Sequence, residues 1–428
     1  MIPALNAAFL SLLSLLVQSS NYDWFIRHQD HISAFLQELF TVLQLIVAST
    51  VVYPTHWIQL KLLSSFIIIS TIKAVSQTLF KLGSQLYKFF IIIMKVKKNY
   101  FEILLKLYLS ESSFCAKLWA SFFSVAISFL GQPVLQLESF VPIKRLKIIK
   151  EFGDMRKEVA FLFRDMWLNL GRNKKHFVSD EDISLVSAVV RMSLVPVHDI
   201  RMATIPIFFD MINFEIANPE SQRASKGWTF ENFERSLVTA LEKYFTEGLG
   251  DQNYIELFVQ VISSWCLQHG SLMVTGLDFV RRMNILMNLL LELREVSKNN
   301  RDEEDQMLSI EKLLNFFETK RLDLYTDYLY KLYSIHICAG NWTEAAYALW
   351  EHANRLAWSD RVLDEDHLTN FVRNKYENCR TERDLKEELY EEIIDLLDKG
   401  KMWEEAIKCC KEMVERHFHL TPGFHMRS

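Results

Sequence analysis

The chain has 428 residues, of which 50% are hydrophobic, and it carries only 12 glycines, 8 prolines and a formal net charge of -5. This length and apolar content allow more than one buried core, and the scarcity of turn residues predicts an all-α protein. No basic stripe is interleaved with aromatic residues, which argues against nucleic acid as a partner. The six cysteines lack CxxC spacing, so we expect reduced thiols and a cytoplasmic location.

The first segment, residues 1–110, is apolar and is expected to be helical. Between Leu39 and Leu60 no residue carries a formal charge, which raises the question of a membrane span. Pro54 interrupts this stretch, and the later apolar runs are far shorter than the roughly 20 residues that a span needs. Met1–Ser20 is apolar like a signal peptide, but it lacks the preceding positive charge and a clear cleavage site. A buried helix is the favoured interpretation, and a membrane-anchored helical protein is the alternative.

The second segment, residues 111–300, shows apolar residues three or four positions apart between short polar connectors. This pattern predicts amphipathic helices stacked in an armadillo- or HEAT-like α-solenoid. One helix is expected across Glu151–Gly171, with Gly171 as its C-terminal stop. Pro206 predicts a helix start or a kink, because proline removes a backbone donor. The polar run Arg294–Gln306 predicts the main domain boundary.

The third segment, residues 307–428, contains two similar stretches, Gly340–Tyr347 and, sixty positions later, Gly400–Ile407. Each glycine is predicted to end a helix in the left-handed conformation, and the alanines that follow allow close helix packing. These features are typical of tetratricopeptide-like hairpins. Asn341 and Glu344 have the spacing of an N-cap and its N3 partner, which predicts the start of a helix.

Several motifs follow one another in a fixed order along the chain. In the second segment they are Gly153–Arg156, Arg164–Trp167, Asn169–Gly171 and Ala203–Met211. In the third they are Tyr328–Leu332, Thr343–Tyr347, Trp358–Ser359 and Asp398–Ile407. Together they resemble the helical-repeat region and the first helical lobe of the exchange domain of the dedicator of cytokinesis (Dock) family of guanine nucleotide exchange factors. The resemblance runs from about Leu118 to the end, is closest to the Rac-directed branch, and shows no match over about Leu79–Tyr108.

The resemblance implies nucleotide exchange on a Rho-type GTPase, with Rac as the expected partner and without covalent catalysis, a cofactor or a metal of the protein's own. The lobes that grip the GTPase and release its nucleotide would lie beyond Ser428, so the chain resembles a truncated member and no catalytic residue is assigned. In the family the first lobe also forms homodimers, which implies a self-contact within about Tyr325–Val414. The alternative is a stand-alone helical scaffold or a dominant-negative isoform.

Seven residues of the third segment are candidates for a dimer or packing surface. They are Tyr325, Tyr328, Trp342, Tyr347, Trp350, Trp403 and Ile407. Exposed tryptophans often anchor partners, but Trp342 and Trp403 occupy matched positions after a helix stop. Packing between helices is therefore the favoured role for these two side chains.

Other residue groups match parts of functional motifs, and for each the plain structural interpretation is favoured. Gly248–Asp251 has no preceding strand and no P-loop lysine, so a turn between helices is predicted. Cys266 and Ser271 lie near His269 without a strained turn, so a structural role is expected. Two histidine groups lack a full ligand set, and no metal site is predicted. These groups are His28, Asp30 and His31, and His417, His419 and His425.

Two basic groups suit either acidic lipid or solvated helix ends. They are Lys144, Arg145, Lys147 and Lys150, and Lys174, Lys175 and His176. Lipid-binding clusters hold about four to eight charges in one tight patch. Solvated helix ends are therefore the favoured interpretation.

Overall fold

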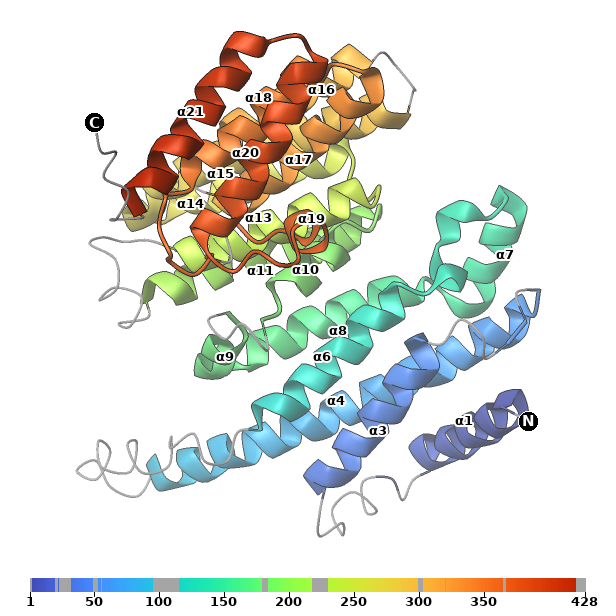
Figure 1. The fold of residues 1–428 in the computed structure, drawn as a ribbon. Coiled ribbons are helices and arrows are strands. Elements are labelled where there is room, and N and C mark those ends of the chain that lie inside the picture. The colour runs from blue at the N-terminus through green and yellow to red at the C-terminus, as the bar shows by residue number, and fades with distance from the viewer. Residues whose placement is uncertain are drawn as a thin grey trace, which may run out of the picture. The chain divides into compact units, whose positions relative to one another are not determined.

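The structure is a computed structural model of the chain. It describes all residues except 1, 20–21, 23–31, 49–52, 55, 95–114, 179–183, 218–229, 299–302, 320, 365–366 and 421–428. The side chains of residues 2, 80–94, 172, 271 and 416–420 are also outside the description. The described chain consists of α-helices and short 3-10 segments without strands (Figure 1), apart from an isolated bridge between Val362 and Thr381. The predicted all-α fold is confirmed.

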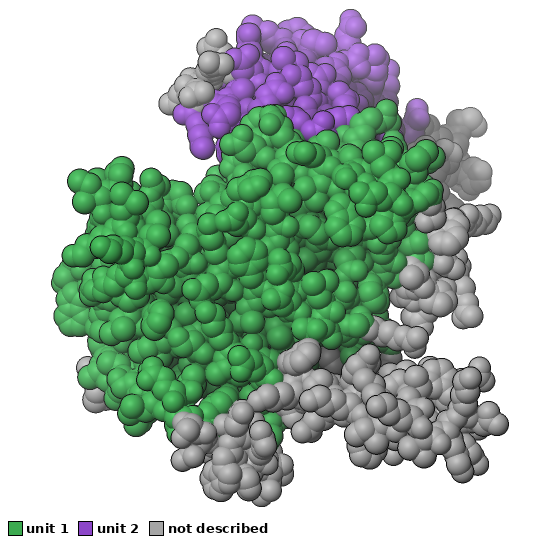
Figure 2. Space-filling model, turned by 180° about the vertical axis from the view of Figure 1, so that it is seen from behind, with its two compact units in different colours: residues 1–281 green, residues 282–428 purple. Residues whose placement is uncertain are grey.

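Two compact units, Met1–Arg281 and Arg282–Ser428, divide the chain (Figure 2). The division falls inside helix α15 (Met273–Lys298). The sequence places the main boundary later, at the polar run Arg294–Gln306, where the described helix stops and α16 begins at Glu303. Each unit is therefore considered by itself.

Unit 1 begins with helices α1 (Ile2–Gln18), α3 (Ile32–Ala48), α4 (Ile58–Met94) and α6 (Ala116–Leu130). Helix α1 packs against α4, and α3 packs against α6. The uncharged stretch Leu39–Leu60 is divided between α3 and α4, with Tyr53 and Pro54 outside both helices, so it is not one spanning helix. One described helix, Ile58–Leu79, is long and apolar enough to cross a membrane, and 44% of its window is buried inside the unit. Core helices of soluble proteins share these properties.

The rest of unit 1 is an array in which each helix packs mainly on helices close to it in the sequence. Its elements are η2 (Pro133–Leu135), η3 (Leu137–Ser139), α7 (Pro142–Phe152), α8 (Met155–Asn169), η4 (Gly171–Lys174), α9 (Lys175–Val178), α10 (Val186–Ser193), α11 (His198–Ala217), α13 (Glu231–Thr246), α14 (Gln252–Gln268), η5 (Gly270–Leu272) and the start of α15. Helix α8 packs on α6 and α11, α10 on α11 and α13, and α11 on α14. This is the arrangement that a solenoid requires.

Aromatic side chains fill the interior between α6, α8 and α9. The ring of Phe123 lies 4.7 Å from Phe163 and 5.7 Å from Phe177. Gly171 has a φ of 55° directly after α8, so the predicted helix stop is confirmed. The helix expected across Glu151–Gly171 is wrong at its start, because α7 ends at Phe152 and α8 begins at Met155. The apolar side chains of α8 are buried except Phe161, which is 37% exposed, the partly exposed Leu162 and the exposed Leu168.

Of the two alternatives expected at Pro206, a helix start or a kink, the helix start is wrong, because Pro206 lies inside α11. A proline within a helix costs about 3 kcal/mol. The neighbouring side chains Ile205, Ile207 and Phe208 are buried, and burial of each large apolar side chain contributes roughly 1.5–3 kcal/mol. Packing therefore outweighs the loss of one backbone hydrogen bond.

Unit 2 contains the end of α15 and two helical hairpins. Its further helices are α16 (Glu303–Phe317), α17 (Leu322–Ala339), α18 (Trp342–Arg355), α19 (Asn370–Lys375), α20 (Glu382–Lys399) and α21 (Trp403–Leu420). Helix α17 pairs with α18, and α20 pairs with α21. The two hairpins meet because α18 also packs against α20. The predicted tetratricopeptide-like hairpins are thus present.

The two glycines of these hairpins serve different purposes. Gly340 has a φ of 77° and ends α17 in the predicted left-handed conformation. For Gly400 the prediction is wrong, since its φ is -77° and Lys401 adopts the left-handed conformation instead. A Cβ on Gly400 would lie 2.4 Å from Thr343 Oγ1. Gly400 is therefore needed for the close approach of the second hairpin to the start of α18.

The N-cap expected at Asn341 is confirmed in position, at the start of α18, but the expected hydrogen bond from its side chain is absent. A reciprocal capping box forms instead at the start of α20, between Thr381 and Asp384. This box satisfies two backbone donors that the helix would otherwise leave free.

We expect Gly400→Ala to destabilise unit 2 by about 1–3 kcal/mol, because the added methyl group overpacks the contact with Thr343. Thr343→Ala should recover part of this loss in the double variant. Gly270→Ala is the matched control, since no atom lies within 4 Å of a Cβ at that position. Urea unfolding followed by circular dichroism measures the difference. Equal stability of Gly400→Ala and the natural chain would contradict the close-approach role.

Candidate interaction site

The seven candidate surface residues separate into three groups by exposure. Tyr325 and Tyr328 are buried, and Trp342 and Trp350 are half-buried. The exposed members are Tyr347 at 44%, Trp403 at 59% and Ile407 at 53%.

Tyr325 and Tyr328 hold the helices of unit 2 together. The Tyr328 ring stacks on Phe317 at 5.6 Å, and the Lys331 ammonium lies 3.9 Å from its centroid. The Arg355 guanidinium lies 4.2 Å from the Tyr325 ring. These contacts join α16, α17 and α18, so both tyrosines are packing residues.

An exposed apolar stripe runs along α21, and we call it the α21 stripe. Its members recur at helical spacing: Trp403, Ile407, Cys410 and Val414. The adjoining face of α21 buries Ala406 and Cys409 against the unit. The Trp403 indole donates a hydrogen bond to Asp398 at 3.1 Å, which fixes the orientation of the ring. The stripe is a preformed apolar surface of the kind that contacts a partner.

Tyr347 and Trp350 form a second aromatic feature, on α18. Their rings are nearly parallel, with centroids 5.9 Å apart. The exposed Tyr347 and the half-buried Trp350 thus make one rigid plate. Such a plate loses little conformational entropy when a partner covers it.

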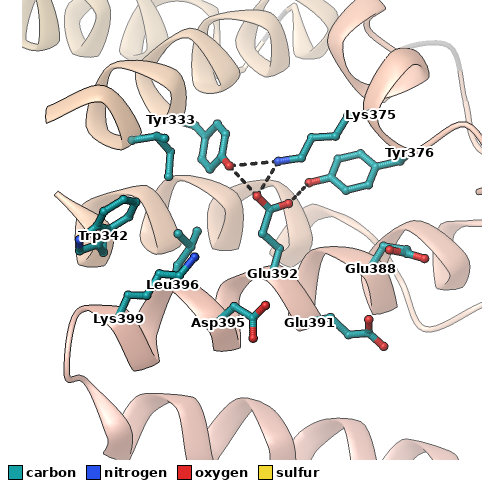
Figure 3. A pocket seen from close by; sticks show the side chains of 11 residues that line it. Tyr333, Trp342, Lys375, Tyr376, Glu388, Glu391, Glu392, Asp395, Leu396 and Lys399 are labelled. Carbon is teal, nitrogen blue, oxygen red and sulfur yellow. Dashed lines mark hydrogen bonds and ion pairs between the residues drawn. The ribbon is translucent and has the colours of Figure 1, made fainter. Parts of the chain in front are cut away.

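A cavity of about 550 Å³ opens in unit 2 beside Trp342, between α17, α19 and α20 (Figure 3). At its wall the Glu392 carboxylate accepts hydrogen bonds from Lys375 at 2.5 Å, Tyr333 at 2.5 Å and Tyr376 at 2.6 Å. Lys375 also donates to the Tyr333 hydroxyl at 3.0 Å. Sequence analysis missed this cluster, because its members come from three helices and share no local spacing.

The electrostatics of the cluster favour a fixed ion pair. Burial raises the pKa of Glu392, but the hydrogen bonds from Lys375, Tyr333 and Tyr376 outweigh it and leave the pKa below its ordinary value. Burial, together with the nearby carboxylate, raises the pKa of Tyr333 and Tyr376, so both phenols keep their protons. A carboxylate with all these donors is a poor base, and the cluster links α17, α19 and α20 structurally.

A second buried polar chain lies nearby in unit 2. The Tyr330 hydroxyl lies 2.9 Å from Nδ1 of His352, and Nε2 of His352 lies 3.2 Å from Nδ1 of His367. If Tyr330 donates a hydrogen bond to Nδ1 of His352, then Nε2 of His352 carries the ring proton and donates a hydrogen bond to Nδ1 of His367. Burial, with smaller effects of His367 and Arg355, lowers the pKa of His352 to about 3. The ring is therefore neutral at physiological pH.

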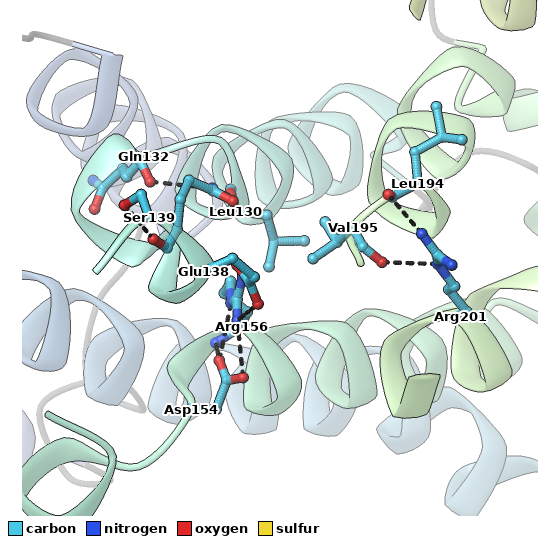
Figure 4. A network of polar contacts seen from close by, with 10 residues as sticks. Leu130, Gln132, Glu138, Ser139, Asp154, Arg156, Leu194, Val195 and Arg201 are labelled. Atoms are coloured by element: carbon cyan, nitrogen blue, oxygen red, sulfur yellow. Dashed lines mark hydrogen bonds and ion pairs between the residues drawn. The ribbon is translucent and has the colours of Figure 1, made fainter. Parts of the chain in front are cut away.

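In unit 1, buried arginines tie the helix ends together (Figure 4). Arg156 donates to both oxygens of Glu138, at 2.7 and 2.9 Å, and also to Asp154. Arg201 donates to the carbonyls of Leu194 and Val195. Burial raises the pKa of Glu138, but the hydrogen bond from Arg156 outweighs it and leaves the pKa lowered. The hydrogen bonds from Arg201 hold the two carbonyls that follow α10.

The motifs that carry the family resemblance contribute to the same kind of contact. The Trp167 indole donates to Asp210 at 2.7 Å, and Lys174 donates to the same oxygen at 2.5 Å. Lys174 is therefore buried and paired, so the solvated helix end expected for it is wrong. Arg156, Trp167 and Asp210 all have structural roles in the described fold.

The other candidates behave as the structural interpretation predicts where the structure describes them. Gly248 and Gly250 have positive φ values in the turn between α13 and α14, and Asp251 caps α14 by accepting from the Tyr254 amide at 2.8 Å. Cys266 is buried, and burial raises the pKa of its thiol. No cluster of metal-ligating side chains occurs among the described residues. Both histidine groups weighed as metal sites lie outside the residues or side chains described.

In the described residues, helices stacked on their sequence neighbours and ending in tetratricopeptide-like hairpins define a helical-repeat protein. Two family models match the chain: "Dedicator of cytokinesis (DOCK) TPR region" over residues 85–261, and "DHR-2, Lobe A" over residues 310–419. The chain belongs to the dedicator of cytokinesis family, which confirms the resemblance of its motifs. The absence of a match expected over Leu79–Tyr108 is wrong from residue 85 onward.

Curated relatives extend the similarity over most of the chain. It is 30% identical to dedicator of cytokinesis protein 4 of Homo sapiens over 391 residues, which cover 91% of this chain and 17% of that protein. It is 32% identical to dedicator of cytokinesis protein 3 of Mus musculus over 395 residues, which cover 90% of this chain and 17% of that protein. The chain thus spans about a sixth of the length of these relatives.

We expect Glu392→Gln to destabilise unit 2 by about 1–3 kcal/mol, because it removes the ionic partner of Lys375 and weakens two phenol hydrogen bonds. A double-mutant cycle with Tyr376→Phe should show a coupling above about 0.5 kcal/mol in urea unfolding. Glu391→Gln, the exposed neighbour on α20, is the matched control and should be neutral. Additive effects of Glu392→Gln and Tyr376→Phe would argue against a shared cluster.

Acidification should destabilise the fold through His352. Its pKa is lower in the folded chain, about 3, than its ordinary value of 6.5, so the unfolded chain binds more protons between these values. The contribution of His352 to the free energy of unfolding is therefore complete above about pH 6.5 and falls by up to about 1.4 kcal/mol per pH unit below it. His352→Gln should flatten this pH dependence. If the free energy of unfolding of His352→Gln depended on pH as steeply as that of the natural chain, His352 would not be the source of the acid sensitivity.

Proposed function

We propose that the chain is a helical scaffold part of a guanine nucleotide exchange factor that acts on Rho-type GTPases, with Rac as the expected GTPase. Membership in the dedicator of cytokinesis family supports this proposal. The chain contributes no covalent chemistry and works in the cytoplasm. Its role is to hold and align the parts of the exchange factor that contact the GTPase.

The scaffold role is distinct from nucleotide release. A GTPase holds its nucleotide through phosphate contacts and a bridging magnesium ion, so release requires these contacts to be weakened. The match at the C-terminal end is to lobe A of the exchange region, over residues 310–419. The polar clusters around Glu392 and His352 are internally paired, which suits a rigid support better than a GTPase-gripping site. We therefore assign no exchange residue to the chain.

The α21 stripe is the observation that supports a self-contact. It offers Trp403, Ile407 and Val414 on one face of the last described helix, beside neighbours that are polar. An isologous dimer uses the same patch twice, so one apolar stripe can cover its own copy. A chain of this kind can also pair with a full-length family member and lower its activity through mixed dimers.

One experiment tests both parts of the proposal. The chain alone should leave the rate of nucleotide release from Rac unchanged, and it should self-associate in sedimentation velocity. Ile407→Asp should weaken self-association at least about tenfold, because it places a charge in a desolvated contact. Leu308→Asp, at a position 52% exposed on α16, is the matched control.

Stimulated nucleotide release by the chain alone would contradict the scaffold role. Self-association that Ile407→Asp leaves intact would contradict the use of the α21 stripe. In mixtures with a full-length family member, inhibition that Ile407→Asp abolishes would support mixed dimers.

A further inference from the structure

Most of the large apolar side chains of helix α7 in unit 1 are exposed to solvent, which is unusual for a solvated helix. Ile148 is its single buried residue, whereas Ile143 is 81% exposed and Leu146 is 67% exposed. Val141, at the N-cap position, and Ile149 are exposed as well. The family resemblance and the proposed function leave this surface without a role.

The exposed apolar residues share one face of α7. Successive residues of a helix are about 100° apart, so Ile143, Leu146 and Ile149 lie within an arc of about 120°. Ile148 follows Leu146 by two positions and lies about 200° around the helix, on the side that packs against the unit. The apolar face is therefore directed away from the protein.

Two basic side chains border this apolar face, and a third lies within it. Arg145 and Lys147 lie about 100° to either side of Leu146, and Lys150 lies about 40° from it. Lys147 and Lys150 are exposed, and the Lys144 ammonium lies 4.9 Å from the Phe140 ring at the start of the helix. The formal charge of the whole chain is -5, so this basic helix is a local exception.

The scaffold holds α7 firmly at its C-terminal end. The one acidic residue of the helix, Glu151, accepts a hydrogen bond from Gln59 at 2.9 Å, and Phe152 lies 6.2 Å from the Phe66 ring. Both partners belong to α4, and Figure 1 shows α7 beside the start of that helix. Gly153, with a φ of 72°, then separates α7 from α8. The apolar face is thus presented from a fixed base.

We propose that α7 is a membrane-surface helix that inserts Ile143, Leu146 and Ile149 into the interface of an anionic lipid bilayer. A helix with an apolar face bordered by Lys and Arg lies in the plane of such an interface, where long basic side chains reach the headgroups. Arg145, Lys147 and Lys150 lie at or near this face, whereas Lys144 lies about 160° from Leu146. Each of the three adds roughly 1 kcal/mol of attraction to an anionic surface, and insertion of the apolar side chains adds the contribution that a count of charges alone leaves out. Because the helix is short and buries little apolar area, its binding to the membrane is reversible. Because basic side chains contribute to the attraction, binding weakens as the salt concentration rises.

Vesicle flotation of the whole chain tests this proposal. The probes are vesicles of phosphatidylcholine alone and vesicles that also contain phosphatidylserine, at low and at raised sodium chloride. The chain should float with the anionic vesicles at low salt and lose most of this binding at high salt. Equal binding to both vesicle types, or no flotation at low salt, would overturn the proposal.

Two pairs of substitutions locate the contact on α7. Ile143→Ser with Leu146→Ser should weaken binding at least about tenfold, because it removes the apolar side chains that insert. Lys147→Glu with Lys150→Glu should have an effect of the same size, because each basic residue near the surface contributes about 1 kcal/mol of attraction. The apolar control is Leu267→Ser with Val274→Ser, at positions 58% and 76% exposed in the same unit. The charge control is Lys117→Glu with Lys298→Glu, which changes the net charge equally. Circular dichroism verifies that each variant is folded, and the single Ile143→Ser replaces the apolar pair if that pair unfolds.

The outcomes separate a lipid surface from other occupants of this face. Loss of binding in both α7 pairs and in neither control supports the proposal. Binding that survives the apolar pair would show that the helix does not insert, and would overturn it. The proposal is also overturned if the apolar pair abolishes self-association in sedimentation velocity and leaves flotation unchanged, because the face would then bind a second copy.

Discussion

The fold depends on one constraint, namely that each amphipathic helix must bury its apolar face against helices close to it in the sequence. In unit 1 the rings of Phe123, Phe163 and Phe177 meet from three successive parts of the array. In unit 2 the same rule joins α17 to α18, α18 to α20 and α20 to α21. Stability in such an array is close to a sum of neighbour contacts. This explains how α11 accommodates Pro206 within a buried helix.

Polar groups complete what apolar packing leaves open at the helix ends. Arg156 and Arg201 reach across turns to carboxylates and free carbonyls, and Asp210 binds two donors from another part of unit 1. Arg156, Lys174 and Arg201 each have a carboxylate partner at hydrogen-bond distance, which offsets the cost of removing their charges from water. The Glu392 and His352 clusters do the same in unit 2. The polar interior of the described protein thus fixes geometry, and the surfaces that we propose for interaction lie outside it, on α7 and α21.

Sequence reasoning predicted the helical class, the paired hairpins and the family, because all three depend on local periodicity and on contiguous motifs. It failed where a residue acts across the fold. Gly400 looks like a helix stop by its position, but its contact with Thr343 becomes visible only when α18 and α20 are packed. Lys174 looks like a solvated charge until Asp210 is placed beside it. Glu392 could not be found, since Tyr333 and Lys375 lie far from it in the chain. The exposed face of α7 was likewise hidden, because periodicity alone does not say which side of a helix the fold covers.

The contact between Gly400 and Thr343 has a consequence for how unit 2 deforms. Because Gly400 has no side chain, the two hairpins are in close contact at Gly400 and Thr343. The tight packing at this point opposes movement of one hairpin along the other. Rotation about that point disturbs fewer atoms than translation along the helices. We therefore expect a force applied to α21 to reach α18 through this contact and to turn the two hairpins about it.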